Sequence, residues 1–396
     1  QAPHTSICVG QLAALDRRVY FEYEPEFLAS GIELSPFKLP LQDGLIEHRD
    51  HPFGPLPGLF DDSLPDGWGL LLMDRHFRRL GVAPEAISPI DRLAYLGLRA
   101  MGALTYHPPH DLEQDHQLLD LHALGKNAEA VYAGQMQDAL PQLERAGGSP
   151  GGASPKVLVG LKGSEVISGQ DDLPEGFEAW IVKFSSPQDV RDAGPLEYAY
   201  ALMAQGAEIR MPPVQLLKVA KDRHHFCIKR FDRGTGNRRI HMHTFGNMVH
   251  ANFRIPSTDY ADLFKVTQIL TRNHQDILEL FRRMVFNIVS HNRDDHAKNF
   301  AFLMDEQGQW SLSPAYDLTF SPGPGGEHST TLLGEGQAPT RMHCLKLADQ
   351  CGMKHDTALT IINLVNEVVQ QWPHYAQQAG CSRRITQQVK KSLRVL

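Results

Sequence analysis

Hydrophobic and polar residues alternate near the start of the chain in the way that β-strands require. The alternation extends over residues 7–23 and is clearest from Arg18 to Tyr23. The stretch Phe60–Met73 offers Asp and Ser caps followed by an apolar helical run to about Leu80, and a second helix is predicted from Ser88 to Gly97, with Ser88 as its N-cap. The run Leu98–Tyr106 returns to a strand pattern. Together these patterns predict a compact unit of mixed helices and strands.

The middle of the chain combines strand patterns with turns and helices. A polar stretch rich in His and Asp, residues 107–125, precedes it and is typical of a linker. The predicted elements that follow are a helix at about Ala128–Arg145, strands at Val157–Leu161, Glu178–Phe184, Val214–Ala220 and His224–Phe231, and a helix at Pro195–Ala204.

Helical periodicity dominates the last third of the chain. Apolar residues at i, i+3 and i+4 predict core helices at Asp259–Thr271 and His274–Ser290, and further helices are predicted at Asp356–Gln370 and Ser382–Val395. The segment Phe320–His328, rich in Gly and Pro, is predicted to be a loop. We therefore predict an α+β protein of three parts, which are residues 1–110, 126–255 and 256–396.

The loop after the helix at His274–Ser290 carries the residues with the clearest chemistry. Asp294, preceded by Arg, is followed five positions later by Asn299, which is the spacing of the protein-kinase catalytic loop. Asp317 lies where a kinase keeps its second magnesium ligand. Phosphoryl transfer requires hard carboxylate and amide oxygens that converge on Mg²⁺ beside a hydroxyl nucleophile. The spacing therefore indicates a phosphotransferase.

Two other interpretations fit this loop when it is taken alone. Polar residues after an apolar helix often form only a C-terminal cap and a turn. The cluster of His291, Asp294, Asp295 and His296 also resembles the ligand set of a metal hydrolase. Residues elsewhere in the chain must decide between these interpretations.

Three further signals occur in the order that a kinase requires. Gly147–Lys156 is a glycine- and serine-rich turn before a strand, which lets backbone N–H groups approach phosphates closely. Lys183 interrupts an apolar strand, and Glu197 follows in the first turn of the next predicted helix. The turn alone is more often a flexible loop, and the lysine alone is more often an exposed edge residue. A strand Lys followed by a helix Glu is nevertheless how kinases direct the Lys at the α- and β-phosphates, so the order favours a kinase.

Composition sets limits on the class of protein. The chain has 396 residues, of which 42% are apolar and 21% are charged, as in globular proteins, and its net charge of −7 argues against binding of nucleic acid by bulk electrostatics. Its cysteines are scattered without metal spacing, which is typical of a reduced, cytoplasmic protein. No apolar run approaches the ~20 residues of a membrane helix, so we expect no membrane association.

With these motifs identified, the sequence resembles the HipA family of serine/threonine kinases, which are toxins of bacterial toxin–antitoxin modules. The resemblance covers nearly the whole chain and rests on Leu64–Gly69, Ser149–Lys156, Ile181–Lys183, Lys229–Arg233, Asp294–Phe300 and Ala315–Asp317. It implies a two-lobed protein-kinase-like fold with an additional N-terminal α+β subdomain and a mostly helical C-terminal lobe. It also implies ATP and Mg²⁺ as cofactors, a protein substrate such as an aminoacyl-tRNA synthetase, and a helix-turn-helix antitoxin through which any DNA contact would be indirect.

The resemblance also implies roles for individual residues. Asp294 would be the catalytic base, Asn299 and Asp317 would hold Mg²⁺, and His296 would approach the γ-phosphate. The nucleotide would be bound by Ser149, Gly151, Gly152, Ala153, Ser154, Lys156, Lys183, Glu197, Lys229 and Phe231. Ser149 matches a serine that undergoes autophosphorylation in the family. A phosphate there would add about −1.5 to −2 charge beside ATP and drive the turn away from the nucleotide.

The chain departs from the family pattern in two places. Pro150 and Pro155 remove N–H donors from the glycine-rich turn. Lys229–Phe231 lies where a kinase has the hinge between its lobes that binds adenine, and Met242–Asn247, which follows it, lacks the acidic residues typical of the family there.

We therefore expect an ATP-dependent serine/threonine protein kinase with in-line transfer. One rival is a small-molecule phosphotransferase, because related folds phosphorylate antibiotics and sugars with a similar loop. The other is a catalytically weak scaffold or corepressor bound to a DNA-binding antitoxin. The presence of Lys183, Asp294, Asn299 and Asp317 argues against that loss of catalysis.

Overall fold

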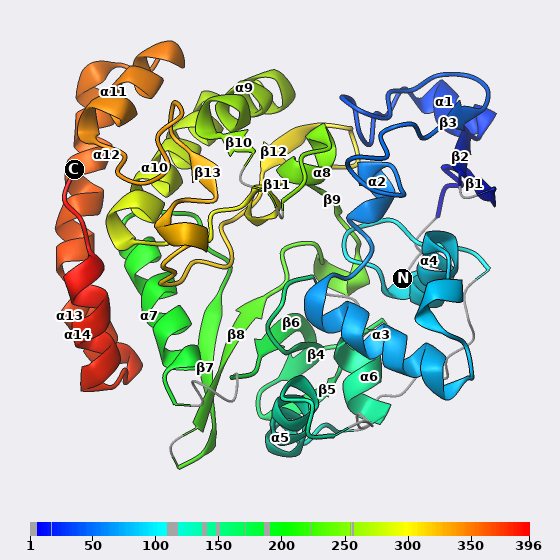
Figure 1. Cartoon of the computed structure of the whole chain (residues 1–396), viewed down its shortest axis with the longest axis horizontal. Coiled ribbons are helices and arrows are strands. Elements are labelled where there is room, and N and C mark those ends of the chain that lie inside the picture. The colour runs from blue at the N-terminus through cyan, green and yellow to red at the C-terminus, as the bar shows by residue number, and fades with distance from the viewer. Residues whose placement is uncertain are drawn as a thin grey trace. The chain divides into compact units, whose positions relative to one another are not determined.

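The computed structural model describes residues 6–16, 18–108, 118–136, 141–147, 151–170, 172–185, 191–221, 223–253, 255 and 257–396 (Figure 1). The chain divides into two compact units. The first comprises Gln1–Ile181, Arg230–Ala251 and Leu303–Gln309, and the second comprises Val182–Lys229, Asn252–Phe302 and Trp310–Leu396.

The first unit begins with a three-stranded antiparallel sheet. Its strands are β1 (Gly10–Leu15), β2 (Arg18–Tyr23) and β3 (Ile46–Glu47), in the order β1-β2-β3. The period of two predicted for β2 buries Val19, Phe21 and Tyr23 and leaves more exposed positions between them. The Phe21 ring packs against Phe60, with 4.9 Å between the ring centroids. The predicted strand at residues 18–23 is therefore confirmed.

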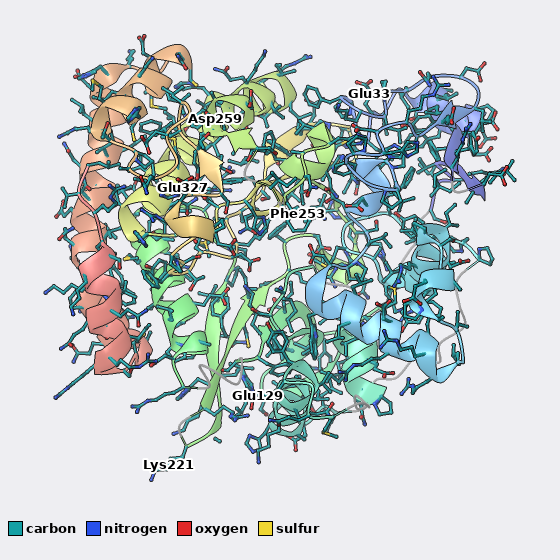
Figure 2. All side chains as sticks on the ribbon, viewed as in Figure 1. Glu33, Glu129, Lys221, Phe253, Asp259 and Glu327 are labelled. Carbon is teal, nitrogen blue, oxygen red and sulfur yellow. The ribbon has the colours of Figure 1, made fainter. Side chains whose placement is uncertain are left out.

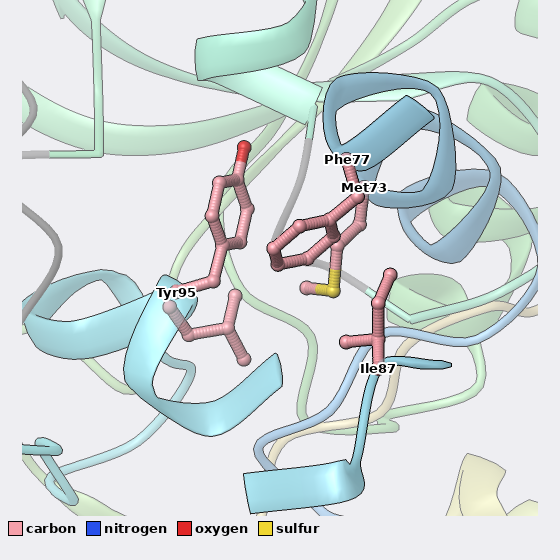
Figure 3. Close-up of a cluster of buried hydrophobic side chains, with 5 residues drawn as sticks. Met73, Phe77, Ile87 and Tyr95 are labelled. Carbon is pink, nitrogen blue, oxygen red and sulfur yellow. The ribbon is translucent and has the colours of Figure 1, made fainter. Parts of the chain in front are cut away.

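Helices supply much of the remaining first unit. They are α1 (Pro25–Ser30), α2 (Gly58–Asp61), α3 (Gly67–Arg79), α4 (Pro89–Leu96), α5 (Leu121–Tyr132), α6 (Pro141–Gly147) and α8 (Phe245–Val249). Met73 and Phe77 of α3 pack against Ile87 and against Tyr95 of α4 in a buried cluster (Figure 3). The predicted N-cap of α4 is confirmed, since the Ser88 hydroxyl accepts a hydrogen bond from the Asp91 N–H at 3.2 Å.

The strand predicted at Leu98–Tyr106 is wrong. A short 3-10 helix, Gly97–Arg99, follows α4, and residues 100–106 form no strand. The Arg99 guanidinium turns back and donates to the carbonyl oxygens of Tyr95 and Leu96, so this segment is bound to the end of α4.

The helix predicted at Ala128–Arg145 is also wrong in its bounds, because it is two helices, α5 and α6. The first begins at Leu121, inside the stretch interpreted as a linker. Asp120 caps it, since its Oδ1 accepts hydrogen bonds from the N–H groups of His122 and Ala123 at 2.9 and 3.1 Å. A capping Asp in a polar stretch was the signal that the linker interpretation overlooked.

A hairpin follows the glycine-rich turn. Strands β4 (Lys156–Lys162) and β5 (Glu165–Ser168) pair antiparallel, with Val159 opposite Ser168. Strand β9 (His241–Thr244) completes the strands that lie wholly in this unit. Strands β6 (Glu178–Lys183) and β11 (Ala301–Met304) each cross the boundary between the units, and Lys183 belongs to the second.

The second unit is mainly helical. Its helices are α7 (Ala193–Gly206), α9 (Tyr260–Thr271), α10 (His274–Ser290), α11 (Arg341–Gln350), α12 (His355–Gln370), α13 (Trp372–Ala379) and α14 (Arg383–Ser392). Helix α10 is buried along most of its length and packs against α9 and α12 (Figure 1). The predicted helices that correspond to α9, α10, α12 and α14 are confirmed. Helices α11 and α13 were not predicted.

The strands that lie wholly in the second unit range from seven residues down to two. Strands β7 (Val214–Ala220) and β8 (Arg223–Lys229) form an antiparallel hairpin, with Lys221 at its tip (Figure 2). Strands β10 (Thr258–Asp259) and β13 (Thr330–Thr331) pair in parallel, and β12 (Trp310–Leu312) precedes Asp317. Within the described ranges, no helix has the length and apolar character that a membrane span requires.

Candidate active site

Helix α10 leads directly into the catalytic loop, which we define as His291–Phe300. His291 ends the helix with a left-handed backbone (φ 61°), a conformation that costs energy for a residue with a Cβ. The loop closes in a 3-10 turn, Ala297–Asn299. The Asn299 amide Nδ2 donates a hydrogen bond to the carbonyl oxygen of Asp294 at 2.6 Å. The backbone of Asp294 is therefore held between a helix end and a turn.

Lys183, at the end of β6, is ion-paired with two carboxylates. Its ammonium contacts Glu197 of α7 and also Asp317, which follows β12. The Phe226 ring lies beneath it, with 5.8 Å between Nζ and the ring centroid. Burial alone would lower the pKa of Lys183, but Asp317 and Glu197 more than offset burial and raise it above its usual value. Lys183 therefore carries a permanent positive charge.

Asp317 also has a left-handed backbone, with φ 53°. Such a conformation is uncommon outside glycine, although Asp tolerates it better than most residues. The neighbouring Tyr316 hydroxyl donates to the carbonyl oxygen of Lys298 at 2.7 Å, which binds this segment to the catalytic loop. Strain of this kind persists only where surrounding contacts hold the residue in place.

Asp294 has a carboxylate that is mostly exposed and electrostatically perturbed. Its side chain is 57% exposed, and the His296 Nε2 atom lies 3.9 Å from its Oδ1. Partial burial raises the pKa of Asp294, nearby Asp317 and Asp295 raise it further, and His296 and Lys183 oppose the shift. A raised pKa makes this carboxylate a stronger proton acceptor than an ordinary aspartate.

The residues at this site fit a magnesium-bound nucleotide. Asp317 supplies a carboxylate, and Asn299 uses its Nδ2 as a donor, which leaves the amide Oδ1 as an acceptor. Carboxylate and amide oxygens are the ligands that Mg²⁺ prefers. The structure thus brings together Lys183, Glu197, Asp294, His296, Asn299 and Asp317, all within the second unit.

His296 lies beside the aromatic ring of Phe253. Its ring centroid is 5.5 Å from that of Phe253, and the Lys298 ammonium lies 4.7 Å from the Phe253 centroid. The His296 Nδ1 is buried and has no hydrogen-bond partner among the described residues.

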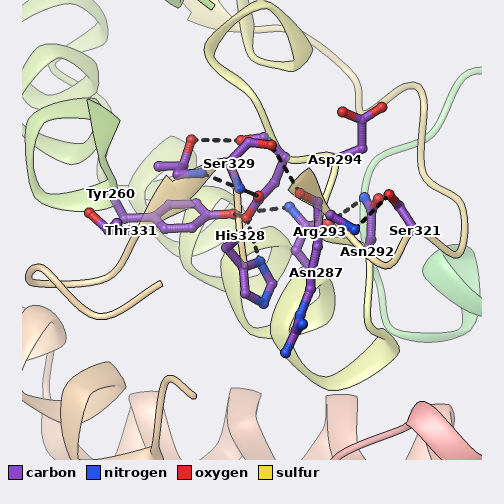
Figure 4. Close-up of polar contacts among 12 residues, drawn as sticks. Tyr260, Asn287, Asn292, Arg293, Asp294, Ser321, His328, Ser329 and Thr331 are labelled. Carbon is purple, nitrogen blue, oxygen red and sulfur yellow. Dashed lines mark hydrogen bonds and ion pairs between the residues drawn. The ribbon is translucent and has the colours of Figure 1, made fainter. Parts of the chain in front are cut away.

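Asp295 is the centre of a buried hydrogen-bond network (Figure 4). Its Oδ2 accepts hydrogen bonds from the Tyr260 hydroxyl at 2.8 Å and from the His328 Nδ1 at 2.9 Å. Its Oδ1 accepts from the N–H groups of Ser329 at 2.9 Å and of Thr330 at 3.3 Å. In Figure 4 the Asp294 carboxylate points away from this network. Asp295 therefore binds the catalytic loop to residues 328–330.

A second aspartate, Asp259, binds the residues that follow Thr330. Asp259 caps α9 by accepting the Ala261 N–H, and it also accepts hydrogen bonds from the Thr331 hydroxyl at 2.6 Å and the Gly334 N–H at 2.8 Å. The segment from His328 to Gly334 is thus held by two carboxylates. The sequence pattern did not predict this role for Asp259 and Asp295, although an Asp directly before a helix was the available signal for Asp259.

The metal-hydrolase interpretation of the loop finds no support. The oxygens of Asp295 are occupied by protein donors, and His291 stacks on Phe320 with 5.6 Å between ring centroids. Over the part of the chain that the structure describes, no three His, Cys, Asp or Glu side chains are grouped so that they could hold a metal ion.

The remaining predicted nucleotide-binding residues are placed as follows. Lys229 ends β8 in the second unit, whereas Phe231 belongs to the first unit. Gly151, Gly152, Ala153, Ser154 and Lys156 lie in the first unit, where the Lys156 ammonium donates to the carbonyl oxygen of Gly151 at 2.6 Å. Ser149 lies outside the described residues. The roles of these residues in binding ATP remain predictions.

Comparison with family models gives two matches that together span most of the chain. The model of the HipA-like C-terminal domain matches residues 148–372, which is more than half of the chain. The model of the HipA N-terminal domain matches residues 4–107.

Related sequences and structures agree with these matches. Two relatives from Sinorhizobium fredii, Y4mE and Y4dM, are described by name as kinases on inference. Y4mE is 30% identical to this chain over 202 residues, and Y4dM is 29% identical over 153 residues. These matches span 46% and 35% of this chain, and 46% and 37% of the two relatives, so less than half of each relative is covered. HipA of Shewanella oneidensis MR-1, solved in complex with HipB and operator DNA, superimposes with a TM-score of 0.70 over 97% of this chain and 93% of that one, at 16% identity. This similarity shows that the two proteins share a fold.

Proposed function

The chain belongs to the HipA family, and we propose that it is an ATP- and magnesium-dependent serine/threonine protein kinase. The observation that carries the proposal is the pairing of Lys183 with both Glu197 and Asp317, in the same unit as Asp294 and Asn299. A lysine fixed by a helix glutamate, beside a carboxylate and an amide that can both ligate Mg²⁺, is the arrangement that phosphoryl transfer from a nucleotide requires.

In the proposed reaction a substrate hydroxyl attacks the γ-phosphorus of ATP in line with the bond to ADP. The new P–O bond forms as the bond to the β-phosphate oxygen breaks, and Asp294 receives the hydroxyl proton. The raised pKa of Asp294 favours this proton transfer. Lys183 neutralises charge on the phosphates, and Glu197 holds the Lys183 side chain in place. Asn299 and Asp317 would hold Mg²⁺, which neutralises charge on the phosphate oxygens when it is bound.

Further residues receive roles within this proposal. His296 is proposed to approach the γ-phosphate, since it lies beside Asp294. The glycine-rich turn, including Ser149, and the predicted hinge at Lys229 and Phe231 are proposed to bind the phosphates and adenine. Autophosphorylation of Ser149 is proposed to drive the turn away from the nucleotide and so switch the kinase off. Intact mass after incubation with Mg–ATP tests the autophosphorylation itself, since the wild type should gain a phosphate and Ser149→Ala should gain none.

The target and partner are proposed from the family. We infer a protein substrate in translation, such as an aminoacyl-tRNA synthetase. We also infer a helix-turn-helix antitoxin as partner, supported by the HipA of Shewanella oneidensis, which was solved with HipB and operator DNA. Any contact of this chain with DNA is proposed to run through that antitoxin.

Transfer of label from γ-labelled ATP tests the activity. The protein is incubated with Mg–ATP and a cell lysate, and label is followed in proteins on a gel and in the small-molecule fraction. Label on Ser or Thr of a protein band is the expected result. Label only in small molecules indicates a small-molecule phosphotransferase instead, and label in neither fraction supports a non-catalytic scaffold.

A further inference from the structure

Asp66 occupies the N-cap position of α3 but does not cap that helix. An N-cap aspartate normally accepts a hydrogen bond from the N–H two or three residues later. Here the backbone has the usual extended conformation, yet the side chain accepts no hydrogen bond from the first turn of α3. Its Oδ1 accepts instead from the N–H of Gly152, in the glycine-rich turn. The carboxylate therefore binds a segment distant in the sequence instead of capping its own helix.

Gly152 completes a reciprocal pair of hydrogen bonds. Its carbonyl oxygen accepts from the N–H of Trp68 at 3.1 Å, and that N–H is one of those at a helix start that has no partner inside the helix. The Trp68 indole Nε1 also donates to the carbonyl oxygen of Lys156 at 3.0 Å. Both ends of the described part of the turn are thus bound to one helix N-terminus.

Gly67, which lies between Asp66 and Trp68, approaches the glycine-rich turn too closely to carry a side chain. A Cβ on Gly67 would lie 2.7 Å from the Cα of Ala153 and 2.8 Å from the carbonyl oxygen of Gly152. Gly67 and Gly152 also both have positive φ, 46° and 98°. Trp68 is only 1% exposed, so its indole is fixed by the core as well as by its hydrogen bond. The carboxylate of Asp66, the bare backbone of Gly67 and the indole of Trp68 thus all contact one turn.

We propose that Asp66, Gly67 and Trp68 are positioning residues that clamp the glycine-rich turn in the shape that binds nucleotide phosphates. The clamp connects two family domains, because these three residues lie in the HipA N-terminal domain and the turn lies in the HipA-like C-terminal domain. The inference rests on the proposed function in one respect, that the turn binds the phosphates of ATP. The N-terminal domain then determines how tightly ATP is bound and leaves the chemical step to Asp294.

Two measurements on the whole protein test the clamp. The first is hydrogen exchange of residues 151–158 without nucleotide, and the second is the KM for ATP together with kcat. In Asp66→Ala, exchange at the turn should accelerate, and KM for ATP should rise about tenfold while kcat changes less than about twofold, as expected for the loss of one charge-assisted hydrogen bond. Asp66→Asn keeps an oxygen that can accept from Gly152 and should restore most of the wild-type behaviour. Trp68→Phe removes the bond to Lys156 together with part of a buried ring, and it should also accelerate exchange at the turn and raise KM for ATP.

Ser88→Ala is the matched control, because it removes a helix cap of the same unit that does not touch the turn. Unchanged exchange in Asp66→Ala, or equal acceleration in Ser88→Ala, would overturn the clamp. Faster exchange with an unchanged KM for ATP would overturn its role in nucleotide binding. If the wild type neither binds nor hydrolyses ATP, the proposed function fails, and hydrogen exchange alone then decides whether the clamp exists.

Discussion

The two faces of the catalytic loop place neighbouring aspartates in opposite environments. The Asp294 side chain is 57% exposed, and the Asn299 amide binds the backbone carbonyl of Asp294 rather than its carboxylate. Asp295 is 1% exposed, and its carboxylate accepts hydrogen bonds from Tyr260, His328 and Ser329. Two residues that adjoin in the chain therefore present their carboxylates to opposite surroundings.

This difference assigns separate roles to the two aspartates, proton transfer to Asp294 and stabilisation of the loop to Asp295. A carboxylate whose oxygens are all used by protein donors cannot also receive a substrate proton. A carboxylate that lies near other negative charges, as Asp294 does near Asp317, costs the folded state some stability and gains proton affinity. We therefore expect changes on the Asp294 face to affect turnover, and changes on the Asp295 face to affect folding first.

Removal of divalent metal should have the largest effect, because Asn299 and Asp317 lie on the Asp294 face. EDTA should reduce phosphoryl transfer to background, and added Mg²⁺ should restore it, while a zinc-selective chelator should have no effect. Activity that survives EDTA but is lost with the zinc chelator would favour the metal-hydrolase interpretation of the loop. Thermal unfolding in EDTA, without nucleotide, should be unchanged.

Asp294→Asn should reduce turnover by about 10²–10⁴-fold, the range of general-base catalysis, with ATP binding retained. The raised pKa means that the folded state binds a proton at Asp294 more tightly than the unfolded state does. Stability therefore falls as pH rises through this pKa, and the neutral Asn should leave the unfolding midpoint at pH 7 unchanged or higher. Calorimetry and a transfer assay on the same sample measure both effects.

Asp295→Ala should lower the free energy of unfolding by about 3 kcal/mol or more, because it leaves buried donors of Tyr260, His328 and Ser329 without an acceptor. Tyr260→Phe removes the hydrogen bond to Asp295 and the one that the Asn287 amide donates to the Tyr260 hydroxyl, and should cost about 1–3 kcal/mol. Denaturant unfolding measures both. An Asp295→Ala variant as stable as the wild type would show that the network contributes nothing to folding.

Glu197→Gln should weaken the hold on Lys183 without removing it, since Asp317 still pairs with the ammonium. KM for ATP should rise about tenfold, as expected for the loss of one charged hydrogen bond. Steady-state kinetics with varied ATP measure the change. Glu208→Gln, which alters an exposed glutamate paired with Arg282 in the same unit, is the control and should behave as the wild type.

The smallest effect concerns pH. Asp294 must be ionised to accept a proton, so kcat/KM should fall as pH is lowered through its pKa. Because that pKa is raised, the fall should begin at a higher pH than for an ordinary aspartate, whose pKa is about 3.9. A pH–rate profile shows this limb, which should be missing from the residual activity of Asp294→Asn.

Local patterns predicted much of the fold and of the site. Helices α9 and α10 have the i, i+3, i+4 stripe of buried helices, and the spacing from Asp294 to Asn299 is set by one short loop. The strand expected after α4 failed because Arg99 turns back onto the end of that helix, a side-chain contact that no periodicity reports. The roles of Asp66 and Asp295 depend on partners 86 and about 35 residues away, so only the folded chain reveals them.

The most direct test of this account measures thermal unfolding and phosphoryl transfer on the same preparations of the wild type, Asp294→Asn and Asp295→Asn. Asp294→Asn should have an unfolding midpoint equal to or above that of the wild type and should lose at least about 10²-fold in transfer, the lower limit for a general base. The account predicts that Asp295→Asn unfolds several degrees lower. Transfer at the wild-type rate by Asp294→Asn would contradict the account.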